Sequence, residues 1–131
     1  MRNALLFAVA SSLLLAGCQT WGPTWSELSG HQYPTGVITL NRRPAIIERV
    51  DDQGSFSSYP VRIDPGTRRL VLGAPAPGWP GGSDLKVFML DAAPCKRYYI
   101  NAQFANPLDR DWTPVIDFVE DIAGCTTQPK Q

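Results

Sequence analysis

The chain has 131 residues, enough for one ordinary domain and too few for two. Twelve Lys and Arg residues balance twelve Asp and Glu residues, and this neutral balance argues against a nucleic-acid partner, which needs a basic face. Twelve Pro and eleven Gly residues are typical of many short strands joined by turns rather than of a helical protein.

The first residues have the pattern of an export signal. A short cationic start at Arg2 precedes an apolar run over residues 4–16. A helix of about 13 residues rises roughly 20 Å, which is short of the ~30 Å hydrocarbon core of a membrane. Residues 1–17 are therefore predicted to be a removable signal peptide.

Residues 15–18 read Leu-Ala-Gly-Cys, which resembles the lipobox of bacterial lipoproteins. The resemblance implies that the Cys18 thiol receives diacylglycerol and that cleavage before it frees its amine for a further acyl chain. Two or more acyl chains hold a protein stably on a membrane. The alternative is an ordinary secretory signal with a chance cysteine. Gln19 stands where Gram-negative inner-membrane lipoproteins tend to have Asp, so the resemblance implies the periplasmic face of the outer membrane.

Residues 18–36 are predicted to be a flexible tether between the anchor and the domain. Two Pro and several Gly residues argue against regular structure there. Trp21 and Trp25 lie beside the anchor, and the sequence leaves open whether their indoles lie among lipid headgroups or pack on the domain. His31, the single histidine, is expected to be a solvated linker side chain.

Residues 37–126 are predicted to form one β-domain. It begins with apolar runs at residues 37–40 and 45–50. Residues 41–44 between these runs and residues 51–54 after them have turn chemistry.

The clearest local signal is a β-hairpin over residues 59–72. Pro65 and Gly66 suit the middle of a type II turn, where Pro fixes φ and Gly supplies a positive φ. Each arm has two apolar side chains that are expected to point inward: Val61 with Ile63, and Leu70 with Leu72.

Three further runs bring the predicted set to about seven short strands, at residues 85–90, 96–104 and 115–122. In the first run, Leu85, Val87 and Met89 share one face. In the second run, Tyr98, Ile100, Ala102 and Phe104 share one face, and Tyr99, Asn101 and Gln103 share the opposite face. In the third run, Ile116, Phe118 and Ile122 are expected inward and Asp117 and Asp121 outward, with a bulge or strand end near Glu120. The pattern predicts an all-β fold, a small antiparallel sandwich or partly open barrel.

Cys95 and Cys125 remain as an even pair once Cys18 is assigned to lipid. In an oxidising compartment such a pair is predicted to form a disulfide. The closed loop of about 31 residues would contribute roughly 3.5 kcal/mol on the chain-entropy estimate. A zinc site or a redox pair is the alternative, but the other ligands and a Cys-x-x-Cys motif are missing from the sequence. No metal and no cofactor are expected.

No catalytic residues are assigned, because the lone histidine and the serines have no partner that the sequence identifies. The acidic segment 109–121 supports an alternative hypothesis, a periplasmic cell-wall hydrolase or an inhibitor of one. Loop and outward strand positions explain these carboxylates equally well.

Four residues are candidates for binding a partner: Trp79, Tyr99, Arg110 and Trp112. Trp79 lies in a Pro/Gly loop, where an exposed aromatic side chain marks a contact site. Its alternative role is to fold down and cap the end of the sandwich. Tyr99 is expected to face outward, and the other two belong to the polar loop 106–114.

Residues 43–72 resemble the PEGA-type module of bacterial envelope proteins. The matching features are the apolar residues 45–47, the acidic turn at Asp51 and Asp52, and residues 60–72 around the Pro-Gly turn. The resemblance implies a small β-sandwich without known catalytic residues. Residues 93–125 resemble small Gram-negative lipoproteins, which adds no functional residue.

These features predict a lipid-anchored, non-enzymatic binding or assembly module that faces the periplasm. Its expected partners are the membrane, through acyl chains on Cys18, and another envelope protein or peptidoglycan. Residues 127–131 are predicted to be a disordered tail.

Overall fold

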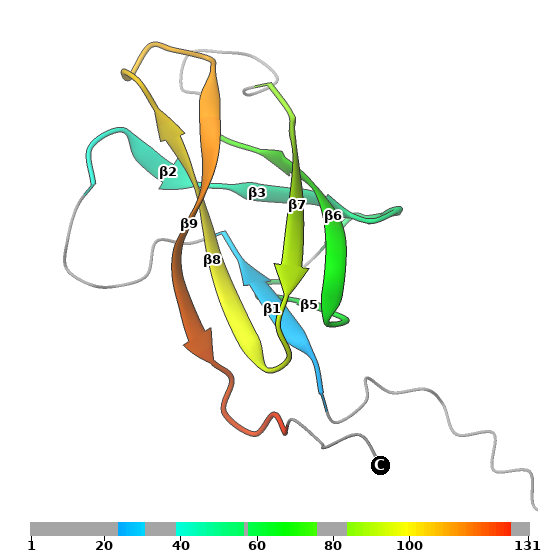
Figure 1. The fold of residues 1–131 in the computed structure, drawn as a ribbon. Coiled ribbons are helices and arrows are strands. Elements are labelled where there is room, and N and C mark those ends of the chain that lie inside the picture. Colours follow the sequence, from blue (N-terminus) through cyan, green and yellow to red (C-terminus); the bar gives the residue numbers. More distant parts are fainter. Residues whose placement is uncertain (1–23, 31–38, 57, 76–83, 127–131) are drawn as a thin grey trace, which may run out of the picture.

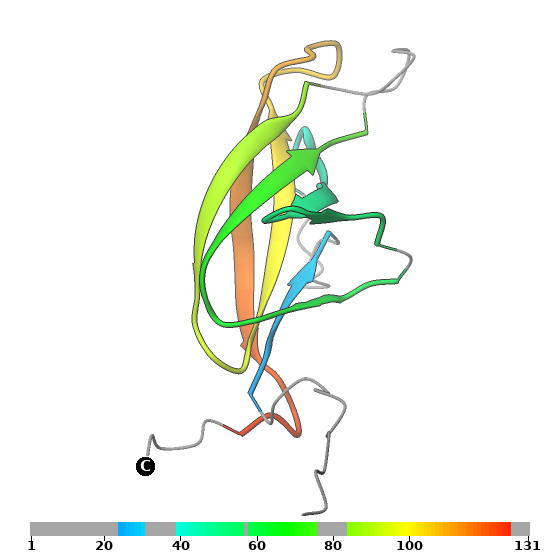
Figure 2. The ribbon, with the colours of Figure 1, turned by 90° about the vertical axis from the view of Figure 1, so that its right-hand side faces the viewer.

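The computed structural model describes residues 24–30, 39–56, 58–75 and 84–126. These residues form nine strands and no helix, which confirms the all-β class. The strands build two sheets that pack face to face, as the two views show (Figures 1 and 2).

Sheet A is centred on one long strand, β8 (Lys96–Phe104). β9 (Trp112–Asp121) pairs with one side of β8 along its whole length. The other side of β8 pairs with β2 (Arg42–Pro44) at one end and with β1 (Ser26–Ser29) at the other. β5 (Val61–Ile63) pairs with β1 and ends the sheet. The β1–β8 pair is parallel, so the prediction of a purely antiparallel sandwich is wrong at that pair.

Sheet B has the order β4-β3-β6-β7 and is antiparallel throughout. Its strands are β3 (Ile46–Val50), β4 (Gln53–Gly54), β6 (Gly66–Gly73) and β7 (Lys86–Ala92). β6 and β7 pair over seven residues and run along the long axis of the molecule (Figure 1).

The core lies between the two sheets and is filled by alternate side chains of the strands. The predicted inward sets of β5, β6 and β8 are confirmed, because all their members are buried. The largest fully buried apolar side chains are Leu28, Leu70, Leu72, Ile100 and Phe104.

The structure corrects the predicted tether. Residues 26–29 form strand β1, whose four residues are all buried, between β5 and β8. The sequence Ser-Glu-Leu-Ser has only one apolar residue, Leu28, so it carried no strand signal. His31 and the tether residues at positions 18–23 and 32–36 lie outside the described residues.

The chain passes from sheet A to sheet B at Ala45, between β2 and β3. This crossing requires a glycine at the end of β1, because a Cβ atom on Gly30 would stand 2.0 Å from the Ala45 carbonyl oxygen. The predicted turn at residues 41–44 is wrong at residues 42–44, because these residues form strand β2. The predicted strand at residues 37–40 is wrong at its end, because Thr39 is not in a strand and Leu40 belongs to an exposed turn.

The predicted hairpin over residues 59–72 is wrong, although both of its arms are strands. β5 pairs with β1 in sheet A, whereas β6 pairs with β3 and β7 in sheet B. Pro65 and Gly66 turn the chain between the sheets, and Gly66 has a positive φ of 111°. A turn signal predicts a change of direction, but it does not decide whether the two arms pair with each other.

Strand β9 contains the predicted bulge, but at a different residue. The register with β8 shifts between Phe118, opposite Tyr99, and Ile116, opposite Ile100. Asp117 is therefore the extra residue, whereas the alternative prediction of a strand end near Glu120 is confirmed, because β9 ends at Asp121. After the bulge Phe118 lies on the outer face, where its ring packs 6.3 Å from that of Tyr99, so its predicted inward orientation is wrong.

The predicted disulfide between Cys95 and Cys125 is present. It joins the start of β8 to the segment that follows β9, and the backbone of Trp25 lies against it. The Cys95 amide donates to the Trp25 carbonyl oxygen at 2.8 Å, and the Trp25 amide lies 3.5 Å from the Cys125 sulfur. These residues define the disulfide end of the domain, where the first described residue, Thr24, also bonds to the Thr126 carbonyl oxygen.

Candidate functional site

Three of the predicted binding residues, Tyr99, Arg110 and Trp112, are described, and these three do not form one surface. Trp112 is buried at 3% exposure and packs in the core, so its predicted role as an accessible contact residue is wrong. Its indole N–H donates to the Asp84 carbonyl oxygen at 2.8 Å. Arg110 is half-exposed in the β8–β9 loop, 3.9 Å from an Asp84 carboxylate oxygen. Trp79 and Cys18 lie outside the described residues.

Tyr99 faces outward as predicted, but it belongs to a polar network on the outer face of sheet A. The centre of this network is Glu27, a carboxylate from β1 that is only 4% exposed. Arg97 donates to Glu27 at 2.6 Å, and the Trp25 indole donates to it at 3.0 Å. Arg62 lies 4.0 Å from Glu27 and stacks over the Trp25 ring at 4.6 Å.

The network continues from β8 to β9 through Glu120. Arg97 and the Tyr99 hydroxyl both donate to Glu120 at 2.6 Å. Burial raises the pKa of Tyr99, and its hydrogen bond to Glu120 adds to the shift. That same hydrogen bond and the Arg97 guanidinium lower the pKa of Glu120 against the effect of burial. Burial disfavours the charged form of Arg97, but hydrogen bonds with its neighbours outweigh burial and raise its pKa. All three groups therefore keep their usual charge at neutral pH.

A second cluster occupies the other half of the same face. Arg42 from β2 and the Asn101 amide both bond to Asp117, the bulge residue of β9. Asn101 is fully buried, and its Oδ1 has no hydrogen-bond partner among the described residues. Arg42 also donates to Gln103 at 2.9 Å. The bulge thus places a carboxylate where it neutralises a cation from β2, the strand on the other side of β8.

The acidic segment 109–121 does not form a paired-carboxylate site. Glu120 and Asp117 belong to the two clusters above, Asp111 pairs with Lys86 at 2.6 Å, and Asp121 pairs with Lys96. Each of these carboxylates is thus held by a different cation. A glycosidase needs two carboxyl groups that face each other across a substrate cleft. The hydrolase hypothesis gains no support from this arrangement.

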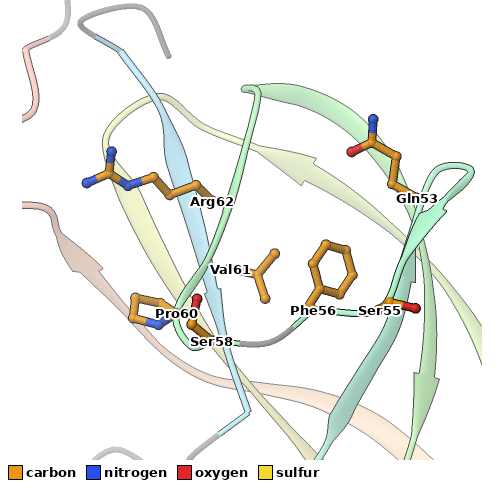
Figure 3. Close-up of a pocket in the computed structure, with 7 residues that line it drawn as sticks. All are labelled: Gln53, Ser55, Phe56, Ser58, Pro60, Val61 and Arg62. Atoms are coloured by element: carbon orange, nitrogen blue, oxygen red, sulfur yellow. The ribbon is translucent and has the colours of Figure 1, made fainter. Parts of the chain in front are cut away.

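A groove lies on another side of the domain, between the two sheets. It has a volume of about 400 Å³ and is formed mainly by the segment that connects β4 to β5. Figure 3 shows its lining, in which Phe56 and Val61 point toward each other while the Arg62 guanidinium extends the opposite way. The remaining lining residues are polar or small: Gln53, Ser55, Ser58 and Pro60.

The groove continues into a second hollow of about 320 Å³ that shares Gln53, Phe56 and Arg62 with the first. Three carboxylates line this second part: Asp51, Asp52 and Asp64. The Arg69 amide and the Arg68 guanidinium donate to Asp51 at 3.0 Å, and these two bonds lower its pKa, so it stays ionised.

The groove combines an aromatic ring with hydrogen-bonding groups and two sheet edges. β4 ends sheet B and β5 ends sheet A, so both strands have backbone N–H and C=O groups that no neighbouring strand of the described part uses. Such edges accept an extended chain as an added strand. No local pattern in the sequence indicates this groove, because the edges meet only after β5 and β6 separate into different sheets.

The described residues contain no cluster of three or more His, Cys, Asp or Glu side chains that could hold a metal ion. They also contain no helix long and apolar enough to cross a membrane. Comparison of the chain with protein-family models, with curated proteins and with solved structures gives no match.

Proposed function

We propose that this protein is a lipid-anchored module of the bacterial cell envelope, held at the periplasmic face of the outer membrane through Cys18, and that it binds a partner without catalysis. The groove between β4 and β5 is the proposed binding site. The partner is an extended segment of another envelope protein or a peptide of the cell wall.

The position of the residues just before β1 supports the membrane anchor in this proposal. Cys18 precedes Thr24 by six residues, which span at most about 22 Å when fully extended. Thr24 lies at the disulfide end, where it bonds to Thr126, and strand β1, which follows it, begins at the bottom of Figure 1. An acyl anchor on Cys18 would therefore hold this end near the membrane, closer than the predicted tether of 18 residues would. The disulfide at the same end agrees with an oxidising compartment.

The groove supports binding rather than chemistry. A hydrolytic site needs a nucleophile, a base and a group that orients the base. The groove instead offers serine hydroxyls, an amide, carboxylates and one ring, spread along its length. These groups can hydrogen-bond an extended backbone, and Phe56 can contact one apolar side chain of it.

The anchor is tested by intact-mass measurement of the protein extracted from membranes. Two or three acyl chains on Cys18 are expected, and the Cys18→Ala chain should carry none. An unmodified Cys18 in the exported protein would overturn the assigned location.

The groove is tested by a photo-crosslinking amino acid at Ser58, incorporated in living cells. We expect a discrete adduct with one envelope protein or wall fragment. The matched control is the same amino acid at Thr113, an exposed residue of β9 outside the groove lining. Adducts at Thr113 that equal those at Ser58, or none at either position, would argue against the groove as the binding site.

A further inference from the structure

The part of the outer face of sheet B that β6 and β7 form is largely apolar although it faces solvent, and the charged Arg49 of β3 borders it beside Val71. Its exposed side chains on β7 and the residue before it are Leu85, Val87 and Met89, at 61%, 56% and 58% exposure. Val71 of β6 lies directly opposite Val87 and extends the patch, and Ile46 of β3 adds to it at 40% exposure. Large contiguous apolar patches on a soluble domain mark interaction sites.

The patch has charges of both signs at its lower edge. Arg69 lies opposite Met89, and Asp91 is the next outward residue of β7. Both are exposed, and neither side chain forms an ion pair within the part of the chain that the structure describes. A charged rim around an apolar centre is the composition of a protein–protein interface.

The pattern is complementary to itself under one particular symmetry. Consider two outer faces packed together about a two-fold axis parallel to β6 and β7, so that β6 of one copy lies over β7 of the other. Val71 then faces the second copy's Val87, and Arg69 faces its Met89, one step from its Asp91. Each interface of this kind contains every contact twice, including two ion pairs in which Arg69 of one copy faces Asp91 of the other.

The same symmetry fits the anchor, and the alternative edge-to-edge arrangement does not. An axis parallel to the strands leaves both disulfide ends on the same side, as two chains anchored in one membrane require (Figure 1). Antiparallel pairing of two β7 edges would instead invert one copy and direct its Thr24 away from that membrane. This step alone rests on the proposed function.

We propose that two copies of this chain form a dimer through the outer faces of their β6 and β7 strands, with Val71, Val87 and Met89 at the centre and Arg69–Asp91 ion pairs at the rim. The groove is lined mainly by the segment between β4 and β5 and not by the outward side chains Val71, Val87 and Met89, so a dimer can still use it to bind a partner.

The test uses the full chain purified from membranes in a non-ionic detergent, with Val87→Cys as the single free thiol. The other cysteines are expected to be acylated (Cys18) or are joined in the disulfide. A short bismaleimide should convert most of this chain to a covalent dimer. The control is Leu108→Cys, a residue of the β8–β9 loop at 83% exposure, which should give at least tenfold less dimer.

A charge exchange tests the specific geometry. In the Val87→Cys chain, Arg69→Asp alone and Asp91→Arg alone should each lower the dimer yield severalfold, and the two together should restore it. Equal yields from Val87→Cys and Leu108→Cys, or no restoration, would overturn the proposal. So would an adduct of Val87→Cys in intact membranes that contains a different protein. The mass of the purified chain reports acylation separately, so a failed dimer is distinguishable from a failed anchor.

Discussion

The outer faces of the two sheets are built on opposite principles. On sheet A, polar side chains from β1, β2, β8 and β9 bond to one another, and the central carboxylate of Glu27 is almost fully buried. On sheet B, the equivalent face presents Leu85, Val87 and Met89 to solvent. The first face pairs most of its polar groups with one another, whereas the second leaves apolar area uncovered.

The difference indicates that the outer face of sheet A contributes to folding stability and the outer face of sheet B to association. Removing one member of a buried polar network leaves the others desolvated without a partner, so such a face contributes to folding. An exposed apolar side chain contributes little to folding, but gains free energy when a second surface covers it. Sheet A should thus respond to mutation in stability, and sheet B in association.

The largest expected effect concerns the disulfide, which fastens sheet A at its end. Cys95→Ser should lower the free energy of unfolding by about 3.5 kcal/mol, because the unfolded chain regains the entropy of the open loop. For a domain of this size the thermal midpoint should fall by roughly 15 °C, measured by circular dichroism. A midpoint within a few degrees of the wild type would contradict this role.

A matched pair of carboxylates compares the two faces directly. Glu27→Ala should cost about 2–3 kcal/mol, because Arg97 and the Trp25 indole lose their acceptor. Glu48→Ala, on the exposed outer face of sheet B, should cost less than about 0.5 kcal/mol. Denaturant titration of both variants measures the difference, and equal costs would remove the contrast between the faces.

The pH dependence of folding stability tests the contribution of the polar network on sheet A. The folded protein lowers the pKa of Glu120 below its ordinary value of 4.5. Its contribution to stability is therefore complete above pH 4.5 and is lost as the pH falls through the lowered value. Glu120→Gln should flatten the loss of stability below pH 4.5 in denaturant titrations. A Glu120→Gln profile that falls as steeply as the wild type would be incompatible with this linkage.

The smallest effect on stability is expected on sheet B. Val87→Thr preserves the β-branched shape in a strand, so the free energy of unfolding should change by less than about 0.5 kcal/mol. Because the hydroxyl is costly to bury, the same change should weaken the dimer severalfold in sedimentation experiments. A large loss of folding stability without a change in association would reverse the roles assigned to the two faces.

Much of the fold could be predicted from local patterns. The alternation in β8 and in the arms of β5 and β6 gave the correct inward residues, and the even pair of cysteines gave the disulfide. The groove could not be predicted, since it depends on which strand edges meet. The burial of Trp112 could not be predicted either, because a loop composition does not reveal that the indole packs into the core and bonds to Asp84.

The sequence by itself determined that the domain is all-β, which side chains share a face in β5, β6, β7 and β8, and which cysteines pair. A two-residue period and turn chemistry are local properties, so they can be read along the chain. Only the tertiary structure decided that β5 and β6 separate, that the polar β1 occupies the middle of a sheet, and that the Leu85–Met89 face points to solvent. Those outcomes depend on which strands pair and which face a second sheet covers, and both are set by contacts between residues far apart in the chain.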